Sequence, residues 1–357
     1  MTRQYGAAVG VRGDCLYCPL PLCIDSYWNC LTNCYHCYMR RLNRTWGEDL
    51  RPADPEDVRR KLQNGLNNRS PKSTLAHALK LKKTLRLGNK TDPYQDAEKE
   101  HKVSRRIQEV LIELEWTYVI QSRHLELLSR DEDLMDEAHR KGLLTVMPVI
   151  TSGMESDWEV LERSRTTPIP RRLELIRGWI NRGWTVGVQG EPFIPGYHTV
   201  EQFRDAIRRI KAVGVGSYNT YNLHFNDHVA KQLASIGIDV RQIWEMNQDA
   251  KWRPVLRSLC DVANREGIRL GCPDFVNVDP SWQEKANTCC GIHVPNPSKF
   301  NTHHWRRLRQ RGLSDDAVLE RTWEGIGEYT EGSKVVRDQS DIFFTLSDSG
   351  KEGGFGL

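Results

Sequence analysis

The chain has 357 residues, of which 38% are hydrophobic and 27% charged, and its formal net charge is +4. This composition is that of an ordinary folded protein, long enough for one α/β barrel of about 250 residues plus an extension. The sequence has no apolar run of the roughly 18 residues that a membrane span needs, and its first residues lack the apolar core of a secretory signal. We therefore expect a cytoplasmic protein that has no membrane partner.

Strand and helix patterns alternate along most of the chain, after a leader rich in Gly, Pro and Cys (residues 1–29) for which we expect an irregular structure. Each β-rich run is followed by a helix pattern, such as the apolar positions at helical spacing in 96–114. Six such βα units predict an α/β fold, a partial (β/α)6 TIM-like barrel. The six runs are 84–90, 117–122, 143–151, 184–196, 216–225 and 268–275.

These patterns divide the chain into an N-terminal leader (1–24), a barrel (25–275) and a C-terminal extension (276–357). The extension breaks the alternation, and it ends in a tail rich in Gly and Ser. In a parallel barrel the chemistry lies at the carboxyl ends of the strands. Candidate residues at such ends are the cysteines of 30–37, and Thr91, Asp92, Ser122, Thr151 and Cys272.

The ten cysteines are many for a cytoplasmic chain, and they are grouped: six lie within 15–37 and three within 272–290. Clustered thiols in a reducing compartment predict metal or redox chemistry. Cys15 and Cys18 form a CxxC pair that could bind a second metal; the alternative is that they are packed thiols. For the isolated Cys260 we expect a small buried apolar residue.

Cys30, Cys34 and Cys37 lie in the segment CLTNCYHC, where they can converge on one side of a tight loop. A structural zinc site and an electron-transfer [4Fe–4S] cluster each take four protein ligands, so three thiols would leave one iron of a cluster open. The spacing resembles that of the radical S-adenosylmethionine (SAM) superfamily, and Tyr35 and Tyr38 follow the second and third cysteines. The alternative is a zinc knuckle completed by His36 or by a distant cysteine.

Over about residues 15–200 the chain resembles the spore photoproduct lyase-like branch of that superfamily, also called DNA repair photolyase-like. The chain departs from the branch at Gln121-Ser122-Arg123, where the family usually has a Thr-Lys-Ser run, so Arg123 stands in for a lysine that would contact SAM. Residues beyond 230 show no such match, and substrate specificity would lie there. The matching stretches are CPLPLCIDSYWNCLTNCYHCY, TDPYQDAEKE, RDEDL, ERSRTTPIPRRLELIR and PFIPG.

The resemblance implies a [4Fe–4S] cluster on Cys30, Cys34 and Cys37, with SAM bound at the open iron. A one-electron reductant such as flavodoxin or ferredoxin would reduce the cluster, and a 5'-deoxyadenosyl radical would then remove hydrogen from the substrate. For Asp92 a turn or helix N-cap is the alternative to a contact with SAM. The residues that would bind SAM are Tyr35, His36, Thr91, Asp92, Ser122, Arg123 and Thr151.

In this branch the target is a modified thymine in DNA, and a base in a duplex must leave the stack to reach a buried radical. Arginine suits phosphate contacts, and two basic segments that carry a tryptophan are candidates for binding DNA. For the second segment the alternative is a solvated helix face with a buried Trp305. The candidate contacts are Arg40, Arg41 and Arg44 in the first segment, and Trp305, Arg306, Arg307, Arg309 and Arg311 in the second.

Cys272, Cys289 and Cys290 admit three interpretations. One of them is a hydrogen-atom donor that quenches a product radical, as a thiol does in spore photoproduct lyase-type chemistry. Alternatively, they hold an auxiliary cluster or zinc together with Cys15 or Cys18, or they are simply buried.

The function that the resemblance implies is cleavage or rearrangement of a bond in a modified thymine of DNA by a radical SAM enzyme. One version is a lyase that repairs a lesion and needs a thiol donor. The other is a bacteriophage-type isomerase of an amino-acid-modified thymidine such as glycinylthymidine, which can return hydrogen from 5'-deoxyadenosine. The alternative from another class is a non-catalytic zinc-binding protein that binds DNA.

Overall fold

The computed structural model describes residues 8–11, 20, 22–39, 49–271 and 312. The residues predicted to bind a second metal, to donate a hydrogen atom or to bind DNA lie outside these ranges, so their roles stay predictions. They are Cys15, Cys18, Arg40, Arg41, Arg44, Cys272, Cys289, Cys290, Trp305, Arg306, Arg307, Arg309 and Arg311.

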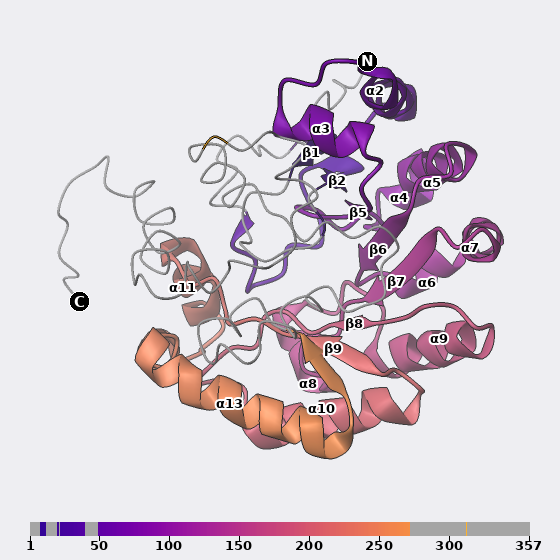
Figure 1. Ribbon diagram of the computed structural model, residues 1–357. Coiled ribbons are helices and arrows are strands. Elements are labelled where there is room, and N and C mark those ends of the chain that lie inside the picture. The colour runs from indigo at the N-terminus through magenta and orange to yellow at the C-terminus, as the bar shows by residue number, and fades with distance from the viewer. Residues whose placement is uncertain (1–7, 12–19, 21, 40–48, 272–311, 313–357) are drawn as a thin grey trace, which may run out of the picture.

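A mostly parallel sheet forms the centre of the fold (Figure 1). Strand β1 pairs antiparallel with β2 at one edge, and β2, β5, β6 and β7 follow as parallel neighbours. The first sheet consists of β1 (Val9–Val11), β2 (Leu22–Ile24), β5 (Leu85–Leu87), β6 (Tyr118–Ser122) and β7 (Leu144–Pro148).

Three further parallel strands continue this sheet in the order β8, β9, β10. Parallel bridges from Val146 to Val186 and from Val149 to Gln189 connect β7 to the β8 segment. Among the described residues β1 and β10 do not pair with each other, so the described strands form an open barrel. The predicted α/β partial barrel is confirmed. These strands are β8 (Val188–Gln189), β9 (Ser217–Asn219) and β10 (Arg269–Gly271).

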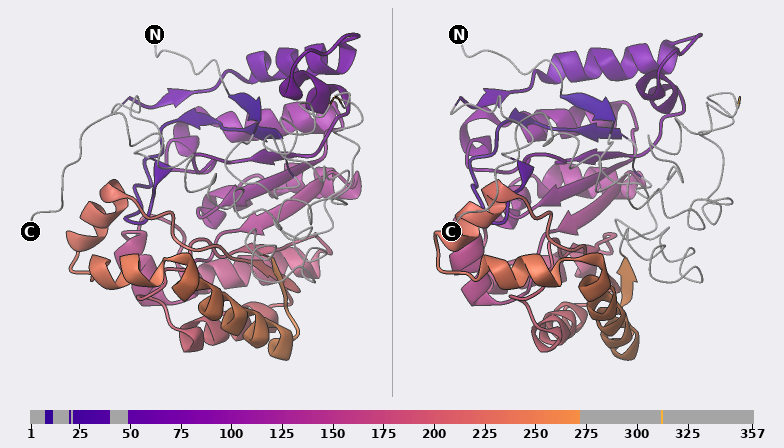
Figure 2. Two further views of the ribbon diagram at one scale, coloured as in Figure 1. Left: turned by 60° about the vertical axis from the view of Figure 1, so that its left-hand side comes forward. Right: turned by 90° about the vertical axis from the view of Figure 1, so that its left-hand side faces the viewer.

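Helices form an outer layer around the strands (Figures 1 and 2). A small ribbon of β3 (Tyr27–Trp28) and β4 (Arg51–Pro52) lies beside the first sheet strands. None of the helices in the described part of the chain is both long and apolar enough to cross a membrane. The helices are α2 (Pro55–Asn67), α3 (Thr74–Lys80), α4 (Glu98–His101), α5 (Val103–Glu113), α6 (Leu125–Ser129), α7 (Glu132–Arg140), α8 (Glu155–Leu161), α9 (Ile169–Asn181), α10 (Val200–Ala212), α11 (Asp227–Ala234), α12 (Val240–Met246) and α13 (Asp249–Glu266).

The two faces of the sheet differ in polarity because successive side chains of a strand point to opposite faces. Ile24, Leu87, Ile120 and Val146 belong to the main hydrophobic core. The alternate positions form the inner face of the sheet, and many of them are polar. The strand registers place these polar residues on one face of β5 to β9: Arg86, Gln121, Thr145, Gln189 and Asn219.

Two predictions about local structure are wrong. The leader contains β1 and β2, strands of three residues that are too short to show a readable period. The single helix predicted over 96–114 is two helices, α4 and α5, because Lys102 adopts a left-handed conformation with φ 48° between them. The prediction for Cys260 is confirmed, since the residue is buried in α13.

Candidate cofactor site at the carboxyl edge of the sheet

The loop that carries the three cysteines begins directly after β3 and turns sharply. Asn29 and Asn33 have φ of 84° and 60°, a left-handed conformation that Asn tolerates better than most residues. The backbone N–H of Cys37 donates to the carbonyl of Cys34 at 3.2 Å, which closes a tight turn between the second and third thiols. Cys34 is buried, whereas Cys30 and Cys37 are half-buried.

The three thiols lie close enough to affect one another's ionisation. Burial raises the pKa of the Cys34 thiol; the positive charge of Arg123 opposes this rise, and the thiolates of Cys37 and Cys30 add to it. In the described ranges no three Cys, His, Asp or Glu side chains form a ready-made metal site. Three thiols on one loop nevertheless fit a cluster chemically, because thiolates are the ligands of iron–sulfur clusters.

His36 offers a poor fourth ligand for zinc. Its Nε2 lies 3.3 Å from a guanidinium nitrogen of Arg123. Burial, together with the charge of Arg123, lowers the pKa of His36 to about 3, so the ring is neutral at physiological pH. The same positive charge would repel a zinc ion bound at this ring.

Gln95 fastens the beginning of the cysteine loop to the barrel. Its fully buried side chain accepts a hydrogen bond from the Leu31 N–H at 2.7 Å and donates one to the Asn29 carbonyl at 3.0 Å. The Thr91 hydroxyl donates to the Tyr27 carbonyl at 3.3 Å, just before the loop. The segment TDPYQ therefore holds the loop that carries the thiols.

Asp92 joins the ends of β5 and β6. Its Oδ1 accepts hydrogen bonds from the Ser122 hydroxyl at 2.7 Å and from the Tyr94 N–H at 2.9 Å, and its Oδ2 accepts one from the Arg123 N–H at 2.7 Å. The bond to Tyr94 is the turn that the sequence offers as an alternative for Asp92. A contact between Asp92 and SAM stays a prediction.

The turn between β5 and this segment depends on Asp25 and Gly88. Oδ1 of Asp25 accepts the N–H groups of Asn89, Lys90 and Thr91 at 3.0, 2.7 and 3.2 Å. Burial raises the pKa of Asp25, and these three donors oppose the rise. Gly88 has φ +90°, and a Cβ there would lie 2.5 Å from the Pro93 side chain, so only glycine fits.

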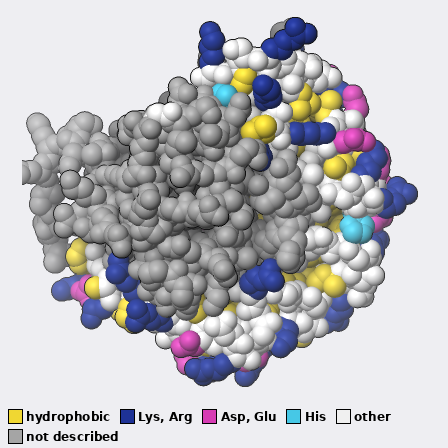
Figure 3. Space-filling model, in the orientation of Figure 1, with side chains coloured by type: hydrophobic (Ala, Val, Ile, Leu, Met, Phe, Trp, Pro, Cys, Tyr) yellow, Lys and Arg dark blue, Asp and Glu magenta, His cyan; other side chains and the backbone are white. Residues whose placement is uncertain are grey.

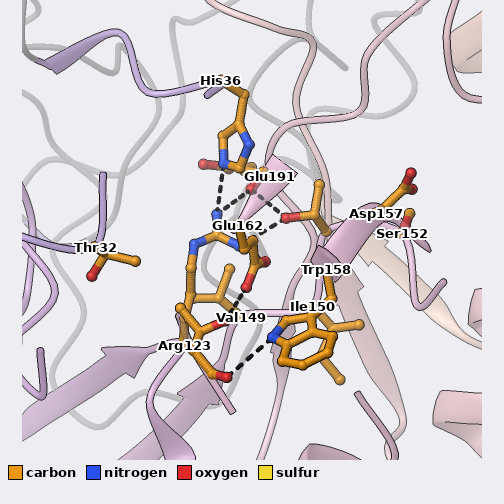
Figure 4. Close-up of polar contacts among 12 residues, drawn as sticks. Thr32, His36, Arg123, Val149, Ile150, Ser152, Asp157, Trp158, Glu162 and Glu191 are labelled. Atoms are coloured by element: carbon orange, nitrogen blue, oxygen red, sulfur yellow. Dashed lines mark hydrogen bonds and ion pairs between the residues drawn. The ribbon is translucent and has the colours of Figure 1, made fainter. Parts of the chain in front are cut away.

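Arg123 connects five segments at the carboxyl edge (Figure 4). Its Nη1 donates to the Thr151 hydroxyl at 2.8 Å and to Glu162 Oε1 at 2.6 Å. Its Nη2 donates to the Glu191 carbonyl at 3.0 Å and lies beside His36. One guanidinium thus joins β6 to the cysteine loop, the segment after β7, the end of α8 and the segment after β8.

Glu162 forms ion pairs with two arginines, one fully buried and one half-buried. Besides Arg123 it pairs with Arg172, which is fully buried and donates to the carbonyls of Val149 and Thr167, at 2.6 Å each. Burial alone would raise the pKa of Glu162, but the charges of Arg172 and Arg123 hold it well below its ordinary value. Glu162 and Arg172 both lie within ERSRTTPIPRR, but the sequence gives no indication that they pair with each other or that Glu162 pairs with Arg123.

Aromatic contacts hold the second half of the cysteine loop. The Tyr35 N–H donates to the Leu161 carbonyl at 2.9 Å, and the guanidinium of Arg163 lies 3.8 Å from the Tyr35 ring centre. The ring of Tyr38 lies 4.3 Å from that of His224, which lies 4.7 Å from that of Tyr221. The loop is therefore packed between the end of α8 and the segment after β9.

A buried pair secures the segment PFIPG. The Ile194 N–H donates to His198 Nδ1 at 2.9 Å, so the proton is on Nε2, which donates to Asp157 Oδ2 at 3.1 Å. The Tyr197 hydroxyl donates to Asp157 Oδ1 at 2.8 Å. Burial acts to raise the pKa of Asp157, but the hydrogen bond from His198 helps to lower it below its usual value. This pair fixes the segment after β8 against α8.

The structure brings most of the described candidates together in two groups at one edge. The Arg123 side chain joins His36 and Thr151 in the first group, and its backbone N–H donates to Asp92, which forms the second group with Ser122. Tyr35, which stacks on Arg163, and Thr91, which donates to the Tyr27 carbonyl, belong to neither group. The sequence indicated each of these residues separately. It missed Gln95, Glu162 and Arg172, whose roles depend on partners that are distant along the chain or buried.

No protein-family model matches the chain, and no curated protein does. Among solved structures, it is similar to spore photoproduct lyase, with a TM-score of 0.53 and 11% identity over 74% of this chain and 79% of that chain. This chain has the fold of spore photoproduct lyase. The expected resemblance is thus confirmed at the level of the fold, and activity must be argued from the site.

Two other similar structures are methylornithine synthase and the cobalamin-dependent S-adenosylmethionine radical enzyme OxsB. For the first, the TM-score is 0.46 with 13% identity over 84% of this chain and 83% of that chain. For OxsB, the TM-score is 0.39 with 10% identity over 69% of this chain and 36% of that chain.

Proposed function

We propose that this protein is a radical SAM enzyme that cleaves or rearranges a bond in a modified thymine of DNA. The observation that carries the proposal is the position of Cys30, Cys34 and Cys37. They lie on one loop at the carboxyl edge of a barrel with the fold of spore photoproduct lyase, and this loop is fixed to the strands by buried hydrogen bonds.

In this proposal the three cysteines hold a [4Fe–4S] cluster, and the groups around Arg123 face the cofactor. When bound, the cluster and SAM would supply a carbon-centred radical that removes a hydrogen atom from the substrate. Gln95 and Arg123 keep the loop in place, and Glu162 cancels one of the buried positive charges near it. Neutral His36 offers a flat ring for adenine without adding a second cation.

The inner face of the sheet supports a polar substrate. Gln121, which directly precedes Ser122 in β6, lies on this face. Its Oε1 is buried without a hydrogen-bond partner among the described residues. A buried acceptor without a partner costs free energy that a ligand donor would recover. An amide group can pair with the N–H and carbonyl of a pyrimidine base, so we assign Gln121 a contact with thymine.

The DNA-binding part of the proposal depends on the two basic segments outside the described residues. On the face that Figure 3 shows, the Lys and Arg side chains of described residues are scattered along the rim and do not form one patch. We therefore propose that 303–311 and 40–44 supply the phosphate contacts.

The test gives the reconstituted enzyme two substrates under anaerobic conditions: an oligonucleotide with a spore photoproduct, and DNA that carries a glycine-modified thymine. Restoration of two thymines identifies a repair lyase. A product of unchanged mass and altered retention identifies an isomerase. If reduced enzyme cleaves SAM but changes neither DNA, the proposed substrate is wrong.

A further inference from the structure

The outer side of the cysteine loop carries exposed aliphatic side chains. Leu31, which directly follows Cys30, is 40% exposed, and Val160 at the end of α8 is 39% exposed. The two segments are in contact, because the Leu161 carbonyl accepts the Tyr35 N–H. In the described residues Trp244 is the one other large hydrophobic side chain with comparable exposure, so two of the three lie on segments of this site.

Two arginines contact the cysteine loop that carries Leu31. The guanidinium of Arg165 donates to the Leu31 carbonyl at 3.4 Å, and that of Arg163 stacks on Tyr35. The nearby acidic residue Glu162 is buried and already paired with two arginines, which leaves Glu159 as the exposed acidic residue of α8 next to Val160. The surface of Leu31, Val160, Arg163 and Arg165 is named the loop patch below.

The backbone that presents these arginines is strained. Arg163 and Ser164 both have positive φ, 57° and 52°, which is costly for residues other than glycine. The Ser164 N–H donates to the Trp158 carbonyl and the Arg165 N–H to the Glu162 carbonyl, at 3.2 Å each, so the turn is held by the end of α8. Strain of this kind persists only where the surrounding structure holds it, and it is concentrated at functional sites.

We infer that the loop patch is the docking surface for an acidic one-electron carrier protein of the flavodoxin or ferredoxin class. This inference rests on the proposed function, because only a redox centre on the cysteine loop gives such a carrier a role. Redox partners form small interfaces, with apolar contacts at the centre and charged residues at the rim. Leu31 and Val160 supply the apolar contacts, and Arg163 and Arg165 attract acidic side chains.

One electron would pass from the partner's reduced centre to the cluster, so the partner is oxidised by one electron and the cluster reduced by one. Cys30 is half-buried next to exposed Leu31, which makes the loop patch a short route to the thiols. DNA is the other polyanion that arginines attract, but protein–DNA contacts go mainly to phosphate and sugar, for which exposed aliphatic side chains have no use.

The experiment measures the affinity of oxidised flavodoxin for the holoenzyme by isothermal titration calorimetry. Arg165→Glu and Val160→Asp place negative charge in the loop patch, and we expect each to raise Kd roughly tenfold. The matched control is Arg140→Glu, which should bind flavodoxin as the wild type does. Arg140 is exposed at the end of α7, before the amino end of β7. Circular dichroism melting checks that all three variants are folded.

The same variants are then assayed for 5'-deoxyadenosine formation with two reductants. With flavodoxin, its reductase and NADPH, the loop-patch variants should be slower than the control, whereas dithionite should drive all of them at the wild-type rate. Unchanged flavodoxin affinity, or weakened affinity for DNA in its place, would overturn the docking surface alone. If the wild type cleaves no SAM even with dithionite, the proposed function fails, and the inference fails with it.

Discussion

At the carboxyl edge of the sheet most buried polar side chains are bonded to one another, with exceptions such as His36 Nδ1, whereas two on the inner face of the same sheet have atoms without a partner among the described residues. Gln95 uses both ends of its amide, and Arg123 makes four polar contacts. Gln121 Oε1 and Thr145 Oγ1 are buried without a partner. The first region is built to hold itself in one arrangement, and the second has capacity left for a ligand.

This difference separates two tasks of the proposed enzyme. A radical reacts only with its intended target if the groups around it are fixed. The network of Asp92, Arg123 and Glu162 fixes the edge without any ligand. Substrate recognition needs polar atoms that become satisfied on binding. Substitutions at the edge should therefore change stability and cofactor binding, and those on the inner face should change substrate turnover.

The largest expected effect is at the cysteine loop. Cys34→Ala removes one of three thiols, so we expect loss of bound iron and of SAM cleavage. The fold should persist, because the loop is also held by Gln95 and Arg123. Iron analysis and a thermal melt of the purified variant check this. Collapse of the fold would favour a structural zinc site in place of a cluster.

Glu162→Gln should cause the largest loss of stability. The substitution leaves the fully buried Arg172 and the half-buried Arg123 without their counter-charge, which costs about 3–5 kcal/mol in the free energy of unfolding. Urea denaturation measures the loss. The matched control is Glu159→Gln, three residues earlier and exposed on α8, which should change the free energy of unfolding by less than about 0.5 kcal/mol. Equal effects at both positions would contradict the buried network.

The lowered pKa of Glu162 predicts how the stability difference between wild type and Glu162→Gln depends on pH. The ionised carboxylate stabilises the fold above its unfolded-state pKa of about 4.3, and this contribution is lost as the pH falls towards the lower folded-state value. The stability difference between wild type and Glu162→Gln should therefore shrink below about pH 4. A difference that grows on acidification would show that Glu162 is protonated in the fold.

Replacing Gln95 and Gln121 by methionine compares the carboxyl edge directly with the inner face. Gln95→Met removes a hydrogen-bond partner from the Leu31 N–H and the Asn29 carbonyl, so we expect a loss of about 1–3 kcal/mol and weaker retention of iron. The control for side-chain size is Gln242→Met, at an exposed position of α12. Urea denaturation and iron per chain after reconstitution are the measurements. Wild-type values for both would show that Gln95 does not secure the loop.

Gln121→Met should have the smallest effect on stability, because it removes an acceptor that has no partner among the described residues. We expect a change of less than about 0.5 kcal/mol together with retained SAM cleavage. Conversion of modified-thymine DNA should fall at least tenfold in the same variant. A stability loss like that of Gln95→Met would mean that polar side chains of the inner face, like those of the edge, are already bonded within the protein.

The sequence predicted the parallel architecture because the βα units repeat and their apolar patterns are local. It also placed Cys30, Thr91, Ser122 and Thr151 at one edge, since parallel strands share a direction. Pairings such as Glu162 with Arg123 could not be predicted, because they join residues that are 39 positions apart through folding of the whole edge. The leader strands β1 and β2 could not be predicted from a pattern, because three residues are too few to show a period.

The sequence stretches that carry the resemblance have structural roles in the fold. In TDPYQ, Tyr94 donates to Asp131 of RDEDL at 2.9 Å, and Gln95 holds the cysteine loop. In ERSRTTPIPRR, Glu162 and Arg172 form the buried pair. Arg123, which stands where a lysine is usual, uses its fork of donors to reach Thr151, Glu162 and the Glu191 carbonyl at once, which an ammonium group could not do.

The most direct test of the central claim is the metal content of wild-type protein purified without oxygen, measured together with SAM cleavage. A radical SAM enzyme should contain about four irons and four sulfides per chain for one cluster, or about eight of each if a second is present, and form 5'-deoxyadenosine when reduced. A colourless protein that contains zinc, lacks iron and sulfide, and leaves SAM intact after reduction would contradict the account.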